Sequence, residues 1–198
     1  MVTVRAQAHT LEAVAAGIVL LASVVFALQV TAVTPLSAST SNQHIENQQL
    51  ATGEGVLTAA SENGALERAV RYWNPTTGSF PNLPPEAAYT TTRQVNNTTL
   101  GRMLVRAFEP RGVIFNVYFA YQTTSGIERR QFIYRGEASD HAVTATRTVT
   151  LYDDEVLYDE DERPTSNTVN GTGSFYAPST SSTGLYNVVR VEVVLWRM

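Results

Sequence analysis

An uncharged apolar segment near the N-terminus, residues 13–33, constrains this chain more than any other feature. It reads AVAAGIVLLASVVFALQVTAV, and its 21 residues include no acidic or basic side chain. A helix of about 20 apolar residues crosses the hydrocarbon core of a bilayer, which is about 30 Å thick. The segment therefore predicts one transmembrane helix, with residues 1–12 on one side of a membrane and the rest of the chain on the other.

The charges beside this segment predict its orientation. Arg5 precedes the segment, and the next arginine along the chain is Arg68. Because cytoplasmic flanks are enriched in arginine and lysine, we expect residues 1–12 to be a cytoplasmic stub or leader. The chain is then a single-pass protein of the cell membrane, with its N-terminus in the cytoplasm and its C-terminal domain extracellular.

Three interpretations of the N-terminal segment are open. It is a permanent anchor, a secretory signal peptide cut near Val30-Thr31-Ala32, or a prepilin-type leader followed by the helix of a filament subunit. The third interpretation comes from residues 5–13, RAQAHTLEA. There a basic and a small residue, then Thr-Leu and a glutamate, precede the unbroken apolar run. This order resembles the N-terminus of type IV pilin-like proteins, both bacterial and archaeal.

The resemblance implies roles for three residues. A prepilin-type peptidase would cut after Ala6 or Gln7, and Glu12 would pair with the freed α-amine of a neighbouring subunit inside the filament. The partners are then the membrane, the peptidase and other pilin-like subunits. In the anchor interpretation Glu12 instead lies solvated among the lipid headgroups, where an acid near a helix N-terminus is favourable.

The composition limits the classes of partner that the chain can bind and indicates the kind of organism that it comes from. The chain has 14 basic residues, all of them arginine, and a net charge of −4. Since it has no basic stripe to neutralise phosphates, we expect no nucleic-acid partner. The absence of cysteine excludes disulfides and thiolate metal sites. The lysine-free composition, rich in Thr, Asp and Glu, suggests a salt-adapted source, and the order of elements is similar to that of uncharacterised pilin-like proteins of halophilic archaea.

The remaining chain predicts an α+β fold. We expect residues 34–62 to be a helical stalk, in which Pro35 kinks the helix or begins a new one. Residues 63–198 then form an extracytoplasmic α+β domain. Apolar residues at helical spacing predict a short helix over 65–73, with Trp73 in the core.

Further elements follow in the second half of the chain. A second helix follows the cap residues Thr98-Thr99, after a long proline-rich loop in which Phe80 and Tyr89 either pin the loop or contact a partner. The apolar period then changes to two, which predicts strands. We expect an antiparallel sheet of about four strands, built from residues 113–121, 127–135, 142–151 and 185–198. The threonines of the third strand should face solvent, and the last strand should lie centrally or beneath a helix.

The acidic run over residues 153–162 contains seven carboxylates. Calcium takes 6–8 oxygen ligands, so this run is a weak candidate for a metal site, with the ligands Asp153, Asp154, Asp159 and Asp161. It lacks the ligand spacing of an EF-hand loop. We therefore favour a solvated, mutually repelling loop, and we expect no metal and no cofactor.

Three asparagines, Asn96, Asn97 and Asn170, begin N-x-Ser/Thr sequons and are candidates for glycosylation. Catalytic motifs are absent from the sequence, which has no G-x-S-x-G, H-E-x-x-H or P-loop pattern. We expect no enzyme. The sequence favours a membrane-anchored, pilin-like structural subunit of a surface filament or pseudopilus, and the alternative is a monomeric membrane-anchored domain with an unidentified binding role.

Overall fold

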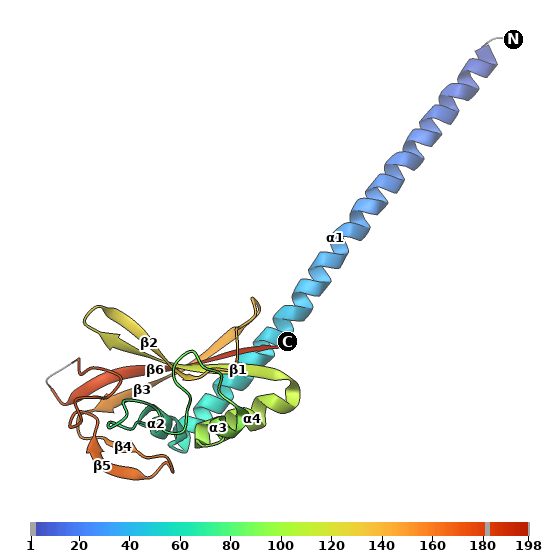
Figure 1. The fold of residues 1–198 in the computed structure, drawn as a ribbon. Helices are drawn as coiled ribbons and strands as arrows, with labels where there is room; N and C mark the ends of the chain where they lie inside the picture. Colours follow the sequence, from blue (N-terminus) through green and yellow to red (C-terminus); the bar gives the residue numbers. More distant parts are fainter. Residues whose placement is uncertain (1–2, 181–182, 198) are drawn as a thin grey trace. The chain divides into compact units, whose positions relative to one another are not determined.

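The computed structural model describes residues 3–180 and 183–197, and it describes side chains in these ranges except for residues 3–8 and 30–42. The chain divides into two compact units, Met1–Ile45 and Glu46–Met198. One long helix, α1 (Thr3–Glu62), contributes residues to both units (Figure 1). We predicted that Pro35 kinks the helix or begins a new one; the helix is continuous across position 35, so no new helix begins there, and a kink remains a prediction.

The first unit is helical throughout its described residues, and its surface between Leu11 and Leu28 is mostly apolar. Large hydrophobic side chains between Leu11 and Leu28 are exposed, with Leu21 at 69% and Phe26 at 68%. The segment His9–Gln29 is long and apolar enough to span a membrane, a property that an anchor and a signal sequence share. The predicted apolar N-terminal helix is therefore confirmed.

The second unit begins within α1, which corrects the predicted domain boundary. Residues 34–62 were expected to form a stalk outside the domain, but Leu57 and Ala60 near the end of α1 are completely buried. The reason is Gly53, which lies against the sheet so closely that a Cβ there would be 2.7 Å from Cβ of Ala145. A glycine in a helix allows this approach because it has no side chain, so the helix from Glu46 onward belongs to the core.

Three short helices and a 3₁₀ turn follow α1, and local signals define their ends. They are α2 (Ala65–Val70), α3 (Thr92–Val95), α4 (Thr99–Phe108) and η1 (Glu109–Arg111). Gly64 precedes α2 with φ 73°, and Thr98 caps α4 by accepting a hydrogen bond from the N–H of Gly101. The predicted helix over 65–73 is therefore three residues too long, because Tyr72 leaves the helix to form a bridge with Tyr158.

The sheet confirms the predicted α+β class. Four antiparallel strands, β1 (Val113–Thr123), β2 (Gly126–Ile133), β3 (Val143–Tyr152) and β6 (Leu185–Arg197), lie in the order β2-β1-β6-β3. The last strand is central, as predicted. A separate two-stranded sheet of β4 (Val156–Tyr158) and β5 (Pro164–Thr168) was not predicted. It forms around the acidic run, whose charges hide the short strand Val156–Tyr158 in the sequence pattern.

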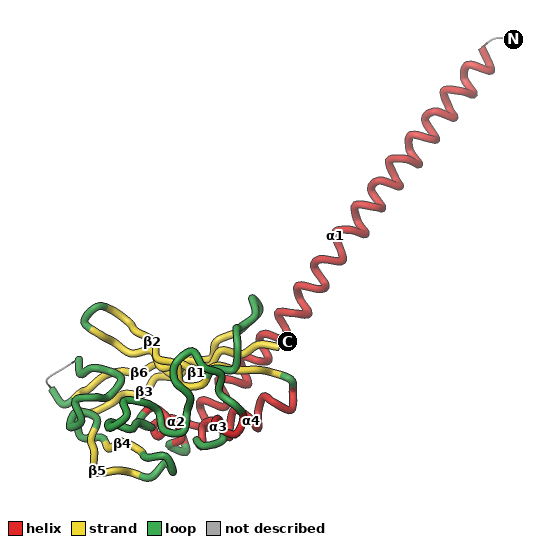
Figure 2. Tube along the Cα trace, in the orientation of Figure 1, coloured by secondary structure: helices red, strands yellow, loops and turns green. Residues whose placement is uncertain are grey.

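The two faces of the four-stranded sheet differ. The helices cover one face of the sheet (Figure 2). Most side chains at alternate positions of β1 and β6 are buried. On β3 the alternation is clearest, since Thr144, Thr146, Thr148 and Thr150 are exposed while Ala145 and Val149 are buried. The predicted solvent-facing threonine row is thus confirmed, and a period of two produces it because successive strand side chains point to opposite faces.

A cluster of aromatic rings forms part of the core. Phe80 lies within 5.0–5.8 Å, centroid to centroid, of four other rings, those of Trp73, Phe119, Phe132 and Tyr176. Trp73 is 3% exposed and donates its indole N–H to the carbonyl of Ser174 at 2.9 Å, which confirms it as a core residue. Of the two loop aromatics, Phe80 is buried and pins the loop, whereas Tyr89 is 55% exposed. Burial also raises the pKa of Tyr72 to about 12 and the pKa of Tyr176 well above 10.

Candidate functional site

The residues with a proposed role in leader cleavage and assembly lie at the start of α1. Ala6 and Gln7 are in the helix but among the residues whose side chains the structure does not describe. Glu12 is described. Its carboxylate is 3.4 Å from Nδ1 of His9, one turn earlier, and both side chains are 81% exposed. The sequence analysis missed this pair, although the three-residue spacing on a helix signals it.

The apolar surface between Leu11 and Leu28 has no polar face. Its large hydrophobic residues are Leu11, Val14, Ile18, Val19, Leu20, Leu21, Val24, Val25, Phe26 and Leu28, and each is at least half exposed. A soluble helix would show an apolar stripe on one side only. Exposed apolar area on all sides fits a membrane anchor or a signal sequence, and Glu12 lies at the N-terminal edge of this area.

The three candidate glycosylation sites differ in accessibility. Asn96 is exposed at the end of α3, but the hydroxyl of its sequon residue Thr98 is buried and caps α4. In the sequon of Asn97 the hydroxyl belongs to Thr99, and it donates a hydrogen bond to the carboxylate of Glu162. Asn170 is exposed in the turn after β5. Modification of all three remains a prediction, and the geometry favours Asn170.

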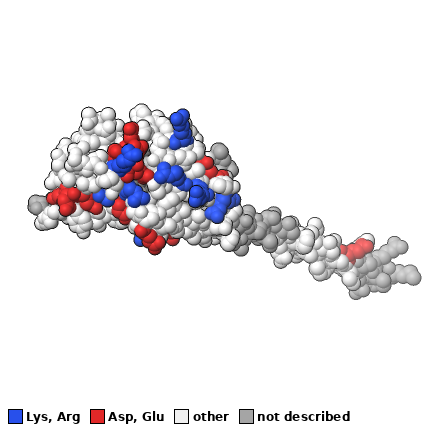
Figure 3. All heavy atoms as spheres, turned by 90° about the horizontal axis from the view of Figure 1, so that it is seen from below, with Lys and Arg blue, Asp and Glu red and all other residues white. Residues whose placement is uncertain are grey.

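The acidic run does not bring its carboxylates together. Asp159 accepts hydrogen bonds from the backbone N–H groups of Asp161 and Arg163 at 3.0 and 2.8 Å. Asp161 pairs with the guanidinium of Arg163 at 2.8 Å, and Glu155 lies 3.6 Å from Arg71. Acidic and arginine side chains are mixed over the face shown in Figure 3. Several of the carboxylates therefore have local partners, which corrects the expectation of a merely solvated, self-repelling loop.

No group of three or more His, Asp or Glu side chains suited to a metal ion occurs within the described residues. Asp153 and Asp154 precede β4, whereas Asp159 and Asp161 follow it, so the strand separates the two pairs of candidate ligands. One oxygen of Asp153 is buried without a hydrogen-bond partner. That the acidic run binds no metal remains a prediction.

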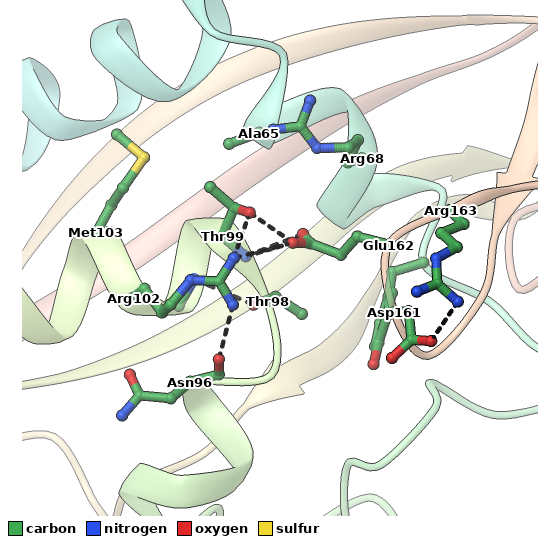
Figure 4. Close-up of polar contacts among 12 residues, drawn as sticks. Ala65, Arg68, Asn96, Thr98, Thr99, Arg102, Met103, Asp161, Glu162 and Arg163 are labelled. Atoms are coloured by element: carbon green, nitrogen blue, oxygen red, sulfur yellow. Dashed lines mark hydrogen bonds and ion pairs between the residues drawn. The ribbon is translucent and has the colours of Figure 1, made fainter.

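Glu162 is the residue of the acidic run with the most contacts. Its side chain is 8% exposed, and both carboxylate oxygens accept from the backbone N–H of Thr99 at 2.9 Å. The Thr99 hydroxyl also donates to it, and Arg102 approaches to 3.4 Å (Figure 4). Thr99 is the first residue of α4, so a carboxylate from the β4–β5 turn neutralises the positive end of that helix. No sequence motif predicts this cap, because Glu162 and Thr99 are 63 positions apart in the chain.

We expect Glu162→Ala to destabilise the second unit by about 2 kcal/mol, since hydrogen bonds to charged groups contribute roughly 1.5–3 kcal/mol. Thermal melting in detergent, followed by circular dichroism, measures the change. Asp161→Ala is the matched control, because its ion pair is exposed on both sides and such pairs contribute at most about 1 kcal/mol. Equal effects of the two substitutions would show that the contact with α4 adds nothing.

One open hollow lies beside the acidic run. It has a volume of about 340 Å³, and Trp73, Asn74, Pro81, Asp159, Glu160 and Asn167 are among the residues that line it. Some of its polar atoms already have partners, since Oδ1 of Asn74 accepts from the N–H groups of Thr76 and Thr77. The hollow offers a small polar surface and no arrangement of nucleophile and base.

These features define an α+β protein with a four-stranded antiparallel sheet and an N-terminal apolar helix long enough to span a membrane. The chain belongs to DUF7288, a family of unknown function, which it matches over residues 5–195. The match therefore includes the apolar helix as well as the whole sheet up to Leu195. No curated protein and no solved structure matches the chain.

Proposed function

We propose that this protein is a membrane-anchored, pilin-like structural subunit whose N-terminal helices pack against one another in a surface filament or pseudopilus. One observation carries the proposal. The single helix α1 presents an apolar surface on all sides between Val14 and Leu28 and supplies core residues to the α+β domain near its end. Such a helix joins a folded domain to a layer of lipid or of neighbouring helices.

Glu12 separates assembly from simple anchoring. In the anchor interpretation its carboxylate is solvated, whereas among packed apolar helices, which exclude water, a carboxylate is unfavourable unless a positive charge is close. Within the described residues, Nδ1 of His9 lies 3.4 Å from this carboxylate. In a bundle of helices, the α-amine of a neighbouring subunit, freed by cleavage after Ala6 or Gln7, supplies a positive charge. The N-terminus is then cytoplasmic and the domain extracellular, by the charge rule applied to Arg5.

The alternative is a monomeric membrane-anchored domain with a binding role. The polar hollow beside the acidic run favours it. We propose a non-enzymatic role in either case, because the sequence has no G-x-S-x-G, H-E-x-x-H or P-loop pattern.

Glu12→Gln tests assembly. We expect at least a tenfold loss of protein from sheared surface fractions, since an unpaired α-amine would remain in the apolar bundle, and tenfold corresponds to about 1.4 kcal/mol. Membrane insertion and leader cleavage should not change. Glu12→Asp should be milder, because it keeps the charge. His9→Ala is the matched control, since it removes the pair within the chain and keeps the α-amine pair.

Mass spectrometry of the mature N-terminus supplies the second measurement. A start at Gln7 or Ala8 supports the pilin-like subunit, and an intact Met1 or a start at Val2 supports the anchor. A start after Ala32 would identify a secretory signal and remove the anchor altogether. Equal surface recovery of the wild type and of Glu12→Gln would contradict assembly through Glu12.

A further inference from the structure

A second hollow of the protein lies at the end of β6, and its lining carries positive charge. It is open and has a volume of about 180 Å³. Three elements supply polar side chains to it, since Gln49 belongs to α1, Arg111 ends η1 and Arg197 ends β6. The buried residues Phe108 and Val113 add an apolar part. All of these residues belong to the second unit.

The two arginines of this hollow have no acidic partner. In the described part of the chain, neither Arg111 nor Arg197 forms an ion pair, and no acidic residue lines the hollow. The arginines of the sheet differ, because Arg129 and Arg190 both bind the carboxylate of Glu192. Like charges that share a hollow repel each other, so a bound anion would be favoured there.

The side-chain amide of Gln49 indicates a ligand independently of the arginines. Gln49 is 7% exposed, and no hydrogen bond joins its side chain to any other described residue. Its amide atoms are not among the fully enclosed polar atoms without a partner, so the amide opens into the hollow that the residue lines. Buried amides are costly unless they are hydrogen-bonded. A ligand in the hollow would supply the missing hydrogen bond.

The free groups of the hollow are mostly hydrogen-bond donors. The hydroxyl of Thr52, which also lines the hollow, already donates to the carbonyl of Gln48 at 2.8 Å. The donors that remain for a ligand are therefore the glutamine amides and the two guanidiniums. Guanidinium groups present parallel N–H donors that match phosphate, sulfate and carboxylate oxygens.

We propose that this hollow binds a tetrahedral oxyanion, which is a phosphate or a sulfate group. Its donors come from three different elements, an arrangement that suits oxygens pointing in four directions better than the two coplanar oxygens of a carboxylate. A dianion also balances the charges of Arg111 and Arg197. The site uses only residues of the second unit, so it does not depend on the assembly proposed for the N-terminal helix.

The size of the hollow limits what can enter it. Pockets for drug-sized ligands have volumes of about 300–1,000 Å³, whereas this hollow has about 180 Å³. It therefore fits a single charged group. Because the hollow is open, that group can be a free anion or the end of a larger molecule whose remainder stays outside.

Calorimetric titration of the full-length protein in an uncharged detergent tests the site. The probes are inorganic phosphate, sulfate and acetate at constant ionic strength. Binding is measured directly, because phosphate and sulfate stabilise proteins in general by exclusion from their surface. We expect saturable binding of phosphate or sulfate, and binding of acetate that is weaker by about tenfold or more, since acetate carries one charge and two oxygens.

Arginine substitutions assign the binding to this hollow. Arg111→Gln combined with Arg197→Gln should weaken phosphate and sulfate binding by about tenfold or more, because both charge-assisted donors are lost. Arg93→Gln is the matched control, since Arg93 is exposed on α3 and does not line the hollow. It should change the affinity by less than about twofold, because solvent screens a distant charge.

Gln49→Met tests the amide. Methionine keeps the length of the side chain and removes its polar atoms, so the affinity should fall by about threefold or more through the lost hydrogen bond. The melting temperature without anion should not fall, because the amide has no partner within the described protein. A lower melting temperature, or full affinity, would overturn the role of Gln49.

Glycerol phosphate distinguishes the two sources of the anion. Affinity equal to that of inorganic phosphate supports a free anion, and affinity about tenfold higher, or 1.4 kcal/mol, supports a phosphorylated molecule. The proposal would be overturned if neither phosphate nor sulfate bound saturably to the wild type. Equal binding by the double arginine variant and Arg93→Gln, or binding of acetate as tight as that of phosphate, would overturn it as well.

Discussion

Gly53→Ala is expected to lower the stability of the second unit by about 2 kcal/mol or more. The new methyl group would lie 2.7 Å from Cβ of Ala145 and 2.8 Å from Cδ1 of Leu195. Overpacking of this kind destabilises by about 1–3 kcal/mol and occasionally more. The neighbour in β3 is a strand Cβ that cannot rotate away, so α1 must move off the sheet. The better helix propensity of alanine, about 1 kcal/mol, offsets only part of this.

Gly55→Ala is the matched control for this substitution. It lies two residues further along the same helix, is exposed, and has no atom within 4 Å of the position that a Cβ would take. Alanine should therefore stabilise the protein there by up to about 1 kcal/mol. Thermal melting of both variants in detergent, followed by near-ultraviolet circular dichroism, measures the difference. Similar melting temperatures for the two would contradict the close contact between α1 and the sheet.

A second pair of substitutions addresses the long loop between α2 and α3. Phe80→Ala is expected to destabilise the second unit by about 3–5 kcal/mol, the usual loss for a buried phenylalanine. Phe80 is 7% exposed and contacts the rings of Phe119 and Phe132 with centroids 5.8 and 5.0 Å away. A loss of this size lowers the melting temperature by on the order of 10 °C in a chain of this length.

Tyr89→Ala provides the comparison within the same loop. Tyr89 is 55% exposed, and no ring contact involves it in the described part of the chain. Its removal should change stability by less than about 0.5 kcal/mol, as is typical of exposed positions. Equal melting temperatures for Phe80→Ala and Tyr89→Ala would contradict this, because they would show that Phe80 does not hold the loop in place.

Most of the secondary structure could be predicted because it depends on local patterns. The alternation of threonine with apolar residues defines β3, and the apolar period of two defines β1 and β6. Helix ends were readable where a glycine or threonine supplies a cap, as at Gly64 and Thr98. The apolar N-terminal segment was equally plain, since length and lack of charge are properties of the sequence alone.

The tertiary structure decided the features that join distant parts of the chain. Gly53 lies at the contact between α1 and the sheet, and the sequence alone does not show this, because the effect of a glycine depends on which residues pack against it. Glu162 looked like one of seven similar acids, yet it caps a helix 63 positions away. The sequence by itself determined the apolar helix and the strands of the four-stranded sheet, since each follows from residues close together in the chain. Only the fold decided which helix end an acid would reach and which glycine a strand would approach, because those depend on contacts between residues far apart in sequence.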